Sequence, residues 1–404
     1  MDTLIDDDGT IEGRLIQSRE SSVSSPQGVS LLVFSDDWGR HPSSCQHLIR
    51  HLLPRIPTAW VNTIGMRTPT FDLATIRRAA EKLRHWSGAG SGTLASLPEN
   101  LSVWNPRMWP AFSGPASRRL NRYLLNSQLQ RRLGSHEGRR VAVTTIPIVA
   151  DLMGRLPVDR WVYYCVDDFS QWPGLDHDTL RRMDCEMIQQ ADSLVAVSET
   201  LQTMIADEGR SASLLTHGVD LNFWNSTSAP SCESPKSQRP SVVFWGVIDR
   251  RMDSASLRKL SQDMLHGTIV LIGPQQNPDP VILSLPNVRT LPAQPLAALP
   301  AIAGQADVLI MPYADLPVTR AMQPLKLKEY LATGKPVVVS RLPSTDSWSD
   351  CLDVAESPEQ FSQLVRDRIA TGIPATQATA RNRLQQESWR SKAAVLEKVL
   401  KENK

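Results

Sequence analysis

The sequence predicts an α/β protein built from two doubly wound domains, each a parallel sheet covered by helices on both faces. The chain has 404 residues, more than one hydrophobic core usually holds. Short runs that are apolar throughout alternate with helix-length segments, as strands buried on both faces require. A Ser- and Pro-rich stretch at 226–240 interrupts this alternation once. We expect that stretch to link the two domains.

The expected elements follow the chain in a regular order. In the first domain the apolar runs are 29–35, 58–64, 101–106, 140–147, 160–166 and 193–198. Helical patterns between them include 43–53 and 178–191. In the second domain the runs are 241–246, 267–273, 306–313 and 335–340, and a helical pattern at about 376–403 closes the chain. Sheets of this kind bind ligands at the carboxyl ends of their strands.

Composition narrows the class of protein. The formal charge of +2 gives no reason to expect binding to nucleic acid. The five cysteines are scattered and form no CxxC pair, a pattern typical of free thiols in a reducing compartment. Because no signal peptide or membrane span is recognisable in the sequence, we expect a cytoplasmic protein. Trp104, Trp109 and Phe112 could meet a lipid interface, but packing in a core is the favoured reading. The first strand of neither domain leads into a G-x-G-x-x-G dinucleotide fingerprint, so a nicotinamide enzyme is a poor fit.

A charged helix at 323–336, QPLKLKEYLATGKP, carries the first functional signal. Pro324 suits its first position and Gly334 its left-handed stop. Lys326 lies in the first turn, where the helix dipole disfavours a cation, so a bound anion such as phosphate would compensate. Glu329 shares the face of Lys326 and could accept hydrogen bonds from a vicinal diol such as ribose. The alternative is an ordinary Lys–Glu pair on the surface.

Four motifs together resemble a known family. They are YYCVDDFSQWPG at 163–174, DCEMIQQADSLVAVSETL at 184–201, THGVDLNFW at 216–224 and MPYADLPVTRAMQPLKLKEYLATGKPVV at 311–338. In this order they are similar to retaining glycosyltransferases of family 4, in a branch linked to cell-surface polysaccharide synthesis. The resemblance implies the GT-B fold, two Rossmann-like domains facing across a cleft. The polar composition of 1–27 predicts a disordered tail before the first domain. Around the linker at 226–240, the resemblance implies an acceptor-side domain at 28–225, a nucleotide-sugar domain at 241–375 and a helix at 376–404 that crosses back to the first domain.

The resemblance also implies a donor site. Glu329 would bind the ribose and Lys326 the diphosphate of a nucleoside-diphosphate sugar. The other donor-binding candidates are Met322 and Gln323 in the covering loop, Arg251 or Arg250 as a second positive group with Arg251 preferred, and Gly39 approaching phosphate from the first domain. Ala321 stands where the family has a glutamate that contacts the transferred sugar, which leaves the donor sugar open.

The catalytic candidates lie at the end of a strand in the first domain. Asp167 and Asp168 could handle the proton of the acceptor hydroxyl, with Asp168 placed first, or they could cap the segment that follows. His217 is expected to be structural. We expect no metal and no cofactor, because lysine, arginine and helix N–H groups would hold the diphosphate.

The sequence therefore predicts a hexose-type transferase that uses a nucleotide sugar and a saccharide or lipid-linked saccharide acceptor. Two alternatives stay open: a nucleotide-sugar 2-epimerase on the same fold, and a non-catalytic nucleotide-sugar-binding protein. Peripheral contact with the inner face of the cell membrane is compatible with a lipid-linked acceptor, whereas a nucleic-acid partner is not expected.

Overall fold

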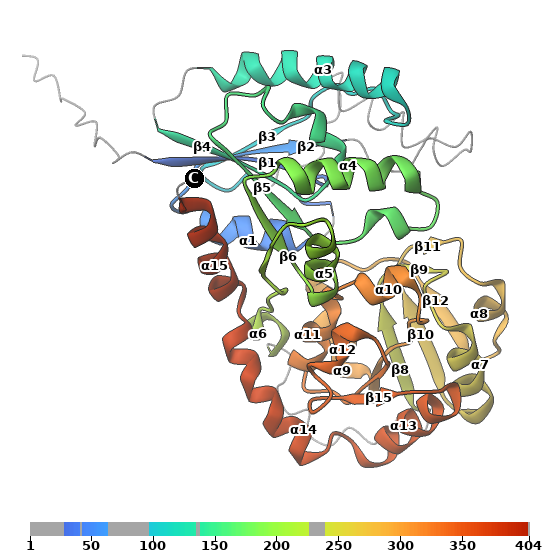
Figure 1. Ribbon diagram of the computed structural model, residues 1–404. Coiled ribbons are helices and arrows are strands. Elements are labelled where there is room, and N and C mark those ends of the chain that lie inside the picture. Colours follow the sequence, from blue (N-terminus) through green and yellow to red (C-terminus); the bar gives the residue numbers. More distant parts are fainter. Residues whose placement is uncertain (1–27, 41–42, 64–96, 135–137, 226–238, 403–404) are drawn as a thin grey trace, which may run out of the picture.

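The computed structural model describes residues 28–40, 43–63, 97–134, 138–225 and 239–402, and Figure 1 shows their arrangement around two large parallel sheets. The predicted tail at 1–27 and most of the predicted linker lie outside these residues. Each apolar run named above forms a strand, because a run that is apolar on both faces can be buried between two helical layers. The fold class predicted from the sequence is confirmed.

The amino-terminal sheet has the strand order β3-β2-β1-β4-β5-β6-β7, and every pairing is parallel. Its strands are β1 Val29–Ser35, β2 Thr58–Asn62, β3 Leu101–Trp104, β4 Arg139–Thr144, β5 Arg160–Cys165, β6 Ser193–Ala196 and β7 Ser213–Leu214. From β1 the chain adds β2 and β3 on one side of the sheet and then β4 to β7 on the other, so the strand order reverses between β1 and β4. The Ser35 and Thr145 hydroxyls lie 2.7 Å apart at this reversal. In open parallel sheets this reversal is where ligands bind.

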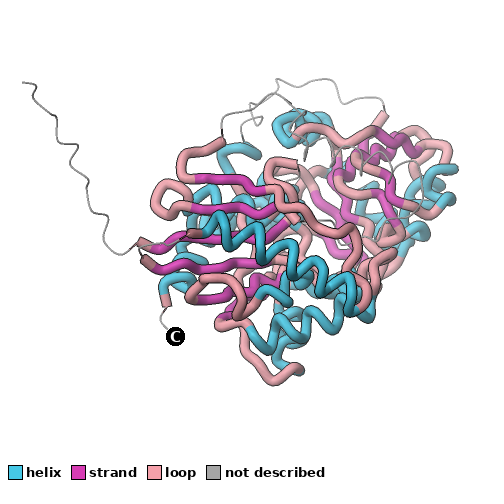
Figure 2. Tube along the Cα trace, turned by 90° about the horizontal axis from the view of Figure 1, so that it is seen from above, coloured by secondary structure: helices cyan, strands magenta, loops and turns pink. Residues whose placement is uncertain are grey.

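Helices cover both faces of this sheet. They are α1 Ser44–Leu52, α3 Pro115–Leu133, η1 Pro147–Leu152, η2 Phe169–Gln171, α4 His177–Gln190, α5 Glu199–Asp207 and α6 Leu221–Asn225. α3, η1 and α4 form one layer, and α1 lies on the opposite face (Figure 1). Seen from above in Figure 2, the strands run side by side beneath helices. Ser43, Asp176 and Ser198 each accept a backbone N–H at the start of the helix that follows, so the sequence itself fixes these helix starts.

The carboxy-terminal sheet repeats the same winding, in the order β12-β10-β8-β13-β14-β15. Its strands are β8 Ser241–Trp245, β10 Thr268–Ile272, β12 Val288–Leu291, β13 Val308–Met311, β14 Val337–Ser340 and β15 Asp353–Ala355, and a separate pair consists of β9 Ile248–Asp249 and β11 Gln275–Gln276. The sequence pattern missed β12 and β15. β12 is an edge strand with alternating exposed side chains, so it lacks the continuous apolar run used to find the others.

The helices of this domain are mostly short. They are α7 Ser254–Asp263, α8 Pro280–Ser284, η3 Leu296–Ala298, α9 Leu299–Gln305, α10 Pro317–Ala321, α11 Leu325–Ala332, α12 Pro343–Asp346 and α13 Pro358–Thr371. α11 begins one residue later than predicted, because Pro324 occupies the capping position with extended backbone. Gly334 has φ of 74°, which confirms the predicted left-handed stop.

The predicted final helix is divided into α14 Ala375–Ala380, η4 Arg381–Glu387 and α15 Trp389–Lys401. α15 packs against α1, and its buried residues Leu396 and Leu400 belong to the core of the amino-terminal domain. The chain therefore passes between the domains again near residue 388, where Ser388 pairs with Val219 as a parallel bridge. Among the helices of the described ranges, none combines the length and apolar character that a bilayer crossing needs.

Candidate functional site

The candidate site lies where winding reverses in the carboxy-terminal sheet, between β8 and β13. Gly246 follows β8 with φ of 143°, and a Cβ there would lie 2.0 Å from Lys326 Nζ. Gly273 follows β10 with φ of 149°, and a Cβ there would lie 1.9 Å from the carbonyl oxygen of Gly246. These two glycines let the strand ends approach each other and leave room for Lys326 above the backbone.

Lys326 brings a positive charge to this strand end. Its ammonium donates a hydrogen bond to the Tyr313 hydroxyl at 2.7 Å and lies 4.3 Å from the ring centroid of Phe244 and 5.1 Å from that of Tyr313. Within the described part of the chain, no carboxylate forms an ion pair with it. A cation held by aromatic rings and one hydroxyl keeps its charge available for an anion.

Glu329 lies on the same helix, one turn after Lys326. Its side chain is half-buried, and burial raises its pKa to about 7, although the Trp245 indole and the Lys326 ammonium favour the ionised form. The Trp245 Nε1–H is buried and makes no hydrogen bond of good geometry with any described residue. The site therefore combines a buried indole N–H, a carboxyl group and a cation.

Arg251 lies in the site, but its charge is already partnered. The side chain is buried and donates to both carboxylate oxygens of Asp249 at 3.0 Å. It also donates to Met322 Sδ at 3.7 Å, and its guanidinium lies 4.5 Å from the Trp172 ring centroid in the amino-terminal domain. Arg250 is exposed and donates to the Asn277 carbonyl. Arg251 thus links the two domains, which its sequence position did not reveal.

The two candidate catalytic aspartates have different environments. Asp168 is half-buried and accepts hydrogen bonds from the Ser170 backbone N–H at 3.0 Å and hydroxyl at 2.6 Å, so it caps η2. Asp167 is buried, and burial raises its pKa to about 7 against the opposing effects of Trp172 and Arg251. The sequence placed Asp168 first as a catalytic candidate; in the structure Asp168 caps η2, and Asp167 is the buried member of the pair.

The loop before α11 packs against the amino-terminal domain. The Ser198 hydroxyl donates to the Ala321 carbonyl oxygen at 3.1 Å, and Met322 and Gln323 are both buried. Gly39 lies in a turn after β1 with φ of 78°, and its N–H is donated to Gln46 Oε1 at 3.0 Å. Its amide is therefore already used within its own domain, and no described hydrogen bond joins it to α11.

Lys328, between the two proposed donor-binding residues, has a role that the sequence did not suggest. Its buried ammonium donates to the Thr216 hydroxyl at 3.2 Å, to the His217 carbonyl oxygen and to Glu387. Lys392 from α15 lies 2.7 Å from the same Glu387 carboxylate. Burial lowers the pKa of Lys328 to about 8. These contacts join α11 to the two places where the chain crosses between the domains. Thr216 and His217 lie before the first crossing, and Glu387 lies at the second.

His217 lies beside this cluster. It is buried, its ring centroid lies 6.3 Å from that of Trp389, and burial together with the Lys328 charge lowers its pKa to about 3. A histidine held neutral in this way acts as a packing group.

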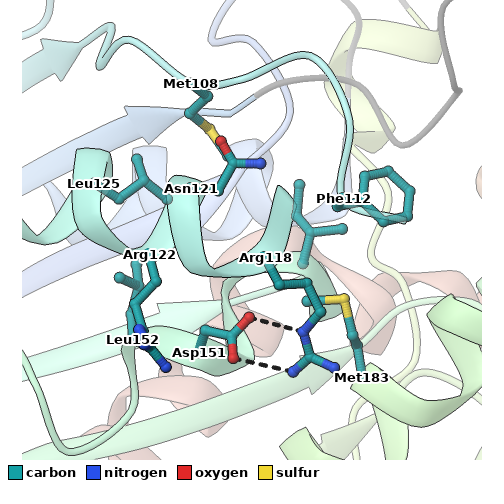
Figure 3. Close-up of a pocket in the computed structure, with 10 residues that line it drawn as sticks. Met108, Phe112, Arg118, Asn121, Arg122, Leu125, Asp151, Leu152 and Met183 are labelled. Atoms are coloured by element: carbon teal, nitrogen blue, oxygen red, sulfur yellow. Dashed lines mark hydrogen bonds and ion pairs between the residues drawn. The ribbon is translucent and has the colours of Figure 1, made fainter. Parts of the chain in front are cut away.

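A small cavity lies elsewhere, beneath α3, and Figure 3 shows the residues around it. Arg118 reaches across it to Asp151 with two hydrogen bonds, at 2.9 and 3.0 Å. Its lining includes none of the predicted donor-binding residues.

Comparison with known proteins supports the architecture. No protein-family model matches the sequence. The sequence is 31% identical over 177 residues to TuaH of Bacillus subtilis strain 168, whose assignment as a teichuronic acid biosynthesis glycosyltransferase is itself provisional. That match covers 41% of this chain and 44% of TuaH, so it spans less than half of the relative.

Solved structures match over almost the whole chain. Anabaena Alr3699/HepE in complex with UDP and glucose has a TM-score of 0.63 and 14% identity, covering 92% of this chain and 99% of that one. The UDP-forming α,α-trehalose-phosphate synthase of Burkholderia vietnamiensis has a TM-score of 0.63 and 12% identity, covering 93% and 99%. Together with the two parallel sheets, these likenesses identify the chain as a protein of the GT-B fold with two Rossmann-like domains.

Proposed function

We propose that this protein is a retaining glycosyltransferase that moves a hexose-type sugar from a nucleoside-diphosphate sugar to a saccharide or lipid-linked saccharide. The observation that carries the proposal is the pair on α11: Lys326, a cation without a carboxylate partner among the described residues, and Glu329, one turn later. A diphosphate and a ribose need these two groups side by side.

The contacts around Gly246, Lys326 and Glu329 support the donor pose that we propose. The diphosphate lies over Gly246 beside Lys326, and the ribose diol donates to Glu329. In the transfer step the acceptor oxygen bonds to the anomeric carbon, the bond from that carbon to the phosphate oxygen breaks, and the acceptor proton passes to the leaving phosphate. Lys326 stabilises the charge that develops on this phosphate. Asp167, 9% exposed, is the side chain that we assign to orienting the acceptor hydroxyl.

The comparisons support a sugar nucleotide as the partner. HepE was solved with UDP-glucose, and the Burkholderia synthase is described as UDP-forming. TuaH supports a place in cell-surface polysaccharide synthesis. Metal independence, a cytoplasmic location and contact with the inner face of the cell membrane are further parts of the proposal. The identity of the sugar is left open, because the methyl group of Ala321 cannot make the hydrogen bonds that the family's glutamate makes there.

Turnover of a donor panel tests the function. The full chain is incubated with UDP-, GDP- and ADP-glucose and a set of saccharide acceptors, and products are followed by NMR, which also reports the anomeric configuration. Transfer with retained configuration is the expected result. Conversion of the donor sugar without transfer would instead identify an epimerase, and donor binding without turnover would identify a binding protein.

Two variants test the site itself. Glu329→Ala and Lys326→Ala should each weaken nucleotide-sugar binding by about 1–3 kcal/mol, the loss expected for hydrogen bonds to charged groups. Lys335→Ala is a matched control, because Lys335 follows the same helix but donates to the Gly304 carbonyl. Unchanged affinity in both site variants would overturn the assignment.

A further inference from the structure

The outer face of α3 has an unusual composition for a surface helix. Its inner stripe, which packs on the sheet, contains Asn121, Leu125, Leu129 and Leu133. The opposite stripe contains Arg119, Leu120, Tyr123, Gln130 and Arg131, all exposed. α3 forms the outermost layer on the side of the amino-terminal domain away from the carboxy-terminal domain (Figure 1).

The charges on this face have one sign. Residues 100–134 contain no acidic residue, and their charged side chains are Arg107, Arg118, Arg119, Arg122, Arg131 and Arg132. Arg118 points inward and pairs with Asp151 (Figure 3). It is also paired with Glu186. Arg122 is partly buried and lines the small cavity beneath α3, whereas Arg119 and Arg131 are exposed and form no ion pair with any described residue. The face therefore has a local positive charge that the nearly neutral chain as a whole lacks.

Large apolar side chains lie among these arginines. Tyr123 is 71% exposed, Trp109 49% and Leu120 41%. Asn121 fixes the Trp109 loop against α3, because its side chain accepts the Trp109 N–H at 2.7 Å and donates to the Trp109 and Ala111 carbonyls. The sequence favoured packing of Trp104, Trp109 and Phe112 in a core or pocket wall. Phe112 is buried and Trp104 is partly buried and lines a cavity, but Trp109 is exposed.

A cavity of about 210 Å³ opens beside the carboxy-terminal half of α3. It is lined by Trp104, Pro106, Gln128, Leu129, Arg131 and Arg132. The Arg132 guanidinium lies 5.6 Å from the Trp104 ring centroid. An apolar lining with two guanidinium groups suits an amphiphile with an anionic head.

We infer that this face, made of α3 and the Trp109 loop, docks on an anionic lipid bilayer, with the cavity accepting a headgroup phosphate. Tryptophan and tyrosine favour the interface of a bilayer, and arginines add attraction to its anionic lipids. A protein partner would leave the unbroken positive charge unexplained, and a nucleic acid would leave Leu120 and Tyr123 unexplained.

The inference deepens the proposed function, on whose lipid-linked acceptor it rests for its biological purpose. The Trp109 loop leaves β3 at the carboxyl-terminal edge of the sheet, the edge at which ligands bind in this fold. Docking through this loop would hold the acceptor side of the protein near membrane-bound substrates.

Cosedimentation of the full chain with vesicles tests the docking in the absence of any donor. One set of vesicles is pure phosphatidylcholine and the other an equal mixture with phosphatidylglycerol. We expect binding to the anionic vesicles, weakening as salt screens the charges, and little binding to the neutral ones. No sugar nucleotide is present, so a lack of vesicle binding would count against the docking surface alone. The proposed sugar transfer is measured separately, with a water-soluble acceptor.

Variants localise the surface. Arg119→Gln and Arg131→Gln should each lower binding to anionic vesicles about fivefold. Tyr123→Ser should lower the binding that remains at high salt. Arg289→Gln and Leu265→Ser are matched controls, exposed in the carboxy-terminal domain, and should change nothing. Thermal unfolding and nucleotide binding should stay at wild-type values in all five variants.

Three results would overturn the inference. They are absence of binding to anionic vesicles, equal binding to neutral and anionic vesicles, and loss of binding in the control variants as large as in the α3 variants. Retention of a short nucleic acid by α3 without any retention of vesicles would equally count against a lipid surface.

Discussion

The pH dependence of donor binding depends on one carboxyl group, Glu329. Burial raises its pKa to about 7, so near neutral pH about half of the molecules without ligand carry a proton there. A ribose diol donates both of its hydrogen bonds to a carboxylate, which requires the ionised form. Binding below pH 7 must therefore release this proton, and the affinity for a nucleoside diphosphate should fall as the pH falls.

The size of the effect follows from the pKa. If the complex keeps Glu329 ionised, the dissociation constant increases by a factor of one plus the ratio of protonated to ionised group in the free protein. Between about pH 8 and about pH 5.5 this amounts to roughly 30-fold, or about 2 kcal/mol. Above pH 8 the affinity should be constant. Isothermal titration calorimetry with UDP in buffers of different ionisation enthalpy measures both the affinity and the released proton.

Glu329→Gln is the matched control, because it keeps the shape of the side chain and removes its titration. The diphosphate itself takes up a proton near about pH 6, and this contribution is the same in both proteins. The ratio of their affinities therefore isolates Glu329. If the ratio does not change with pH, or if proton release is identical in the two proteins, Glu329 does not bind the ribose.

Other perturbations have separate outcomes. Lys326→Met should weaken UDP binding about tenfold to a hundredfold in calorimetry while leaving uridine binding unchanged, because only the diphosphate contacts the ammonium. Glu387→Gln should lower the free energy of unfolding, measured in urea, by about 3 kcal/mol, because it leaves the buried Lys328 ammonium without its carboxylate partner. Lys328→Met should lower the free energy of unfolding by less, because an apolar side chain can be buried there without a partner. Gly273→Ala should destabilise the protein and abolish UDP binding, because the new Cβ would overlap a backbone oxygen 1.9 Å away; wild-type melting and binding would show that the strand ends can separate. Transfer activity should persist in EDTA, and loss restored by a divalent cation would refute metal independence.

Local sequence accounted for most of the fold. The strands buried on both faces appear as continuous apolar runs, and the starts of α1, α4 and α5 coincide with capping side chains. The short edge strands β12 and β15 escaped prediction because β12 alternates with exposed side chains and β15 has only three residues, one of them the aspartate Asp353. The closing helical pattern was not resolved into three elements, because helix periodicity continues through the 3₁₀ segment η4.

The residues of the candidate site were predicted only in part. Lys326 and Glu329 were singled out because a cation in the first turn of a helix that leads into a buried strand is unusual, and their role in binding a donor stays a prediction. The roles of Tyr313, Trp245 and Trp172 were missed, since an aromatic residue near a strand end has no local sign of whether it packs in a core or lines a site.

The sequence by itself determined most of the segments that become strands and helices, and it singled out α11 as the candidate anion-binding helix. Tertiary structure decided which charges remain available there. Lys328 is neutralised by Glu387, 59 residues away, and Asp167 rather than Asp168 is the buried member of its pair. The physical reason is that strand and helix patterns depend on neighbours along the chain. Burial and ion pairing, by contrast, depend on residues that only folding brings together.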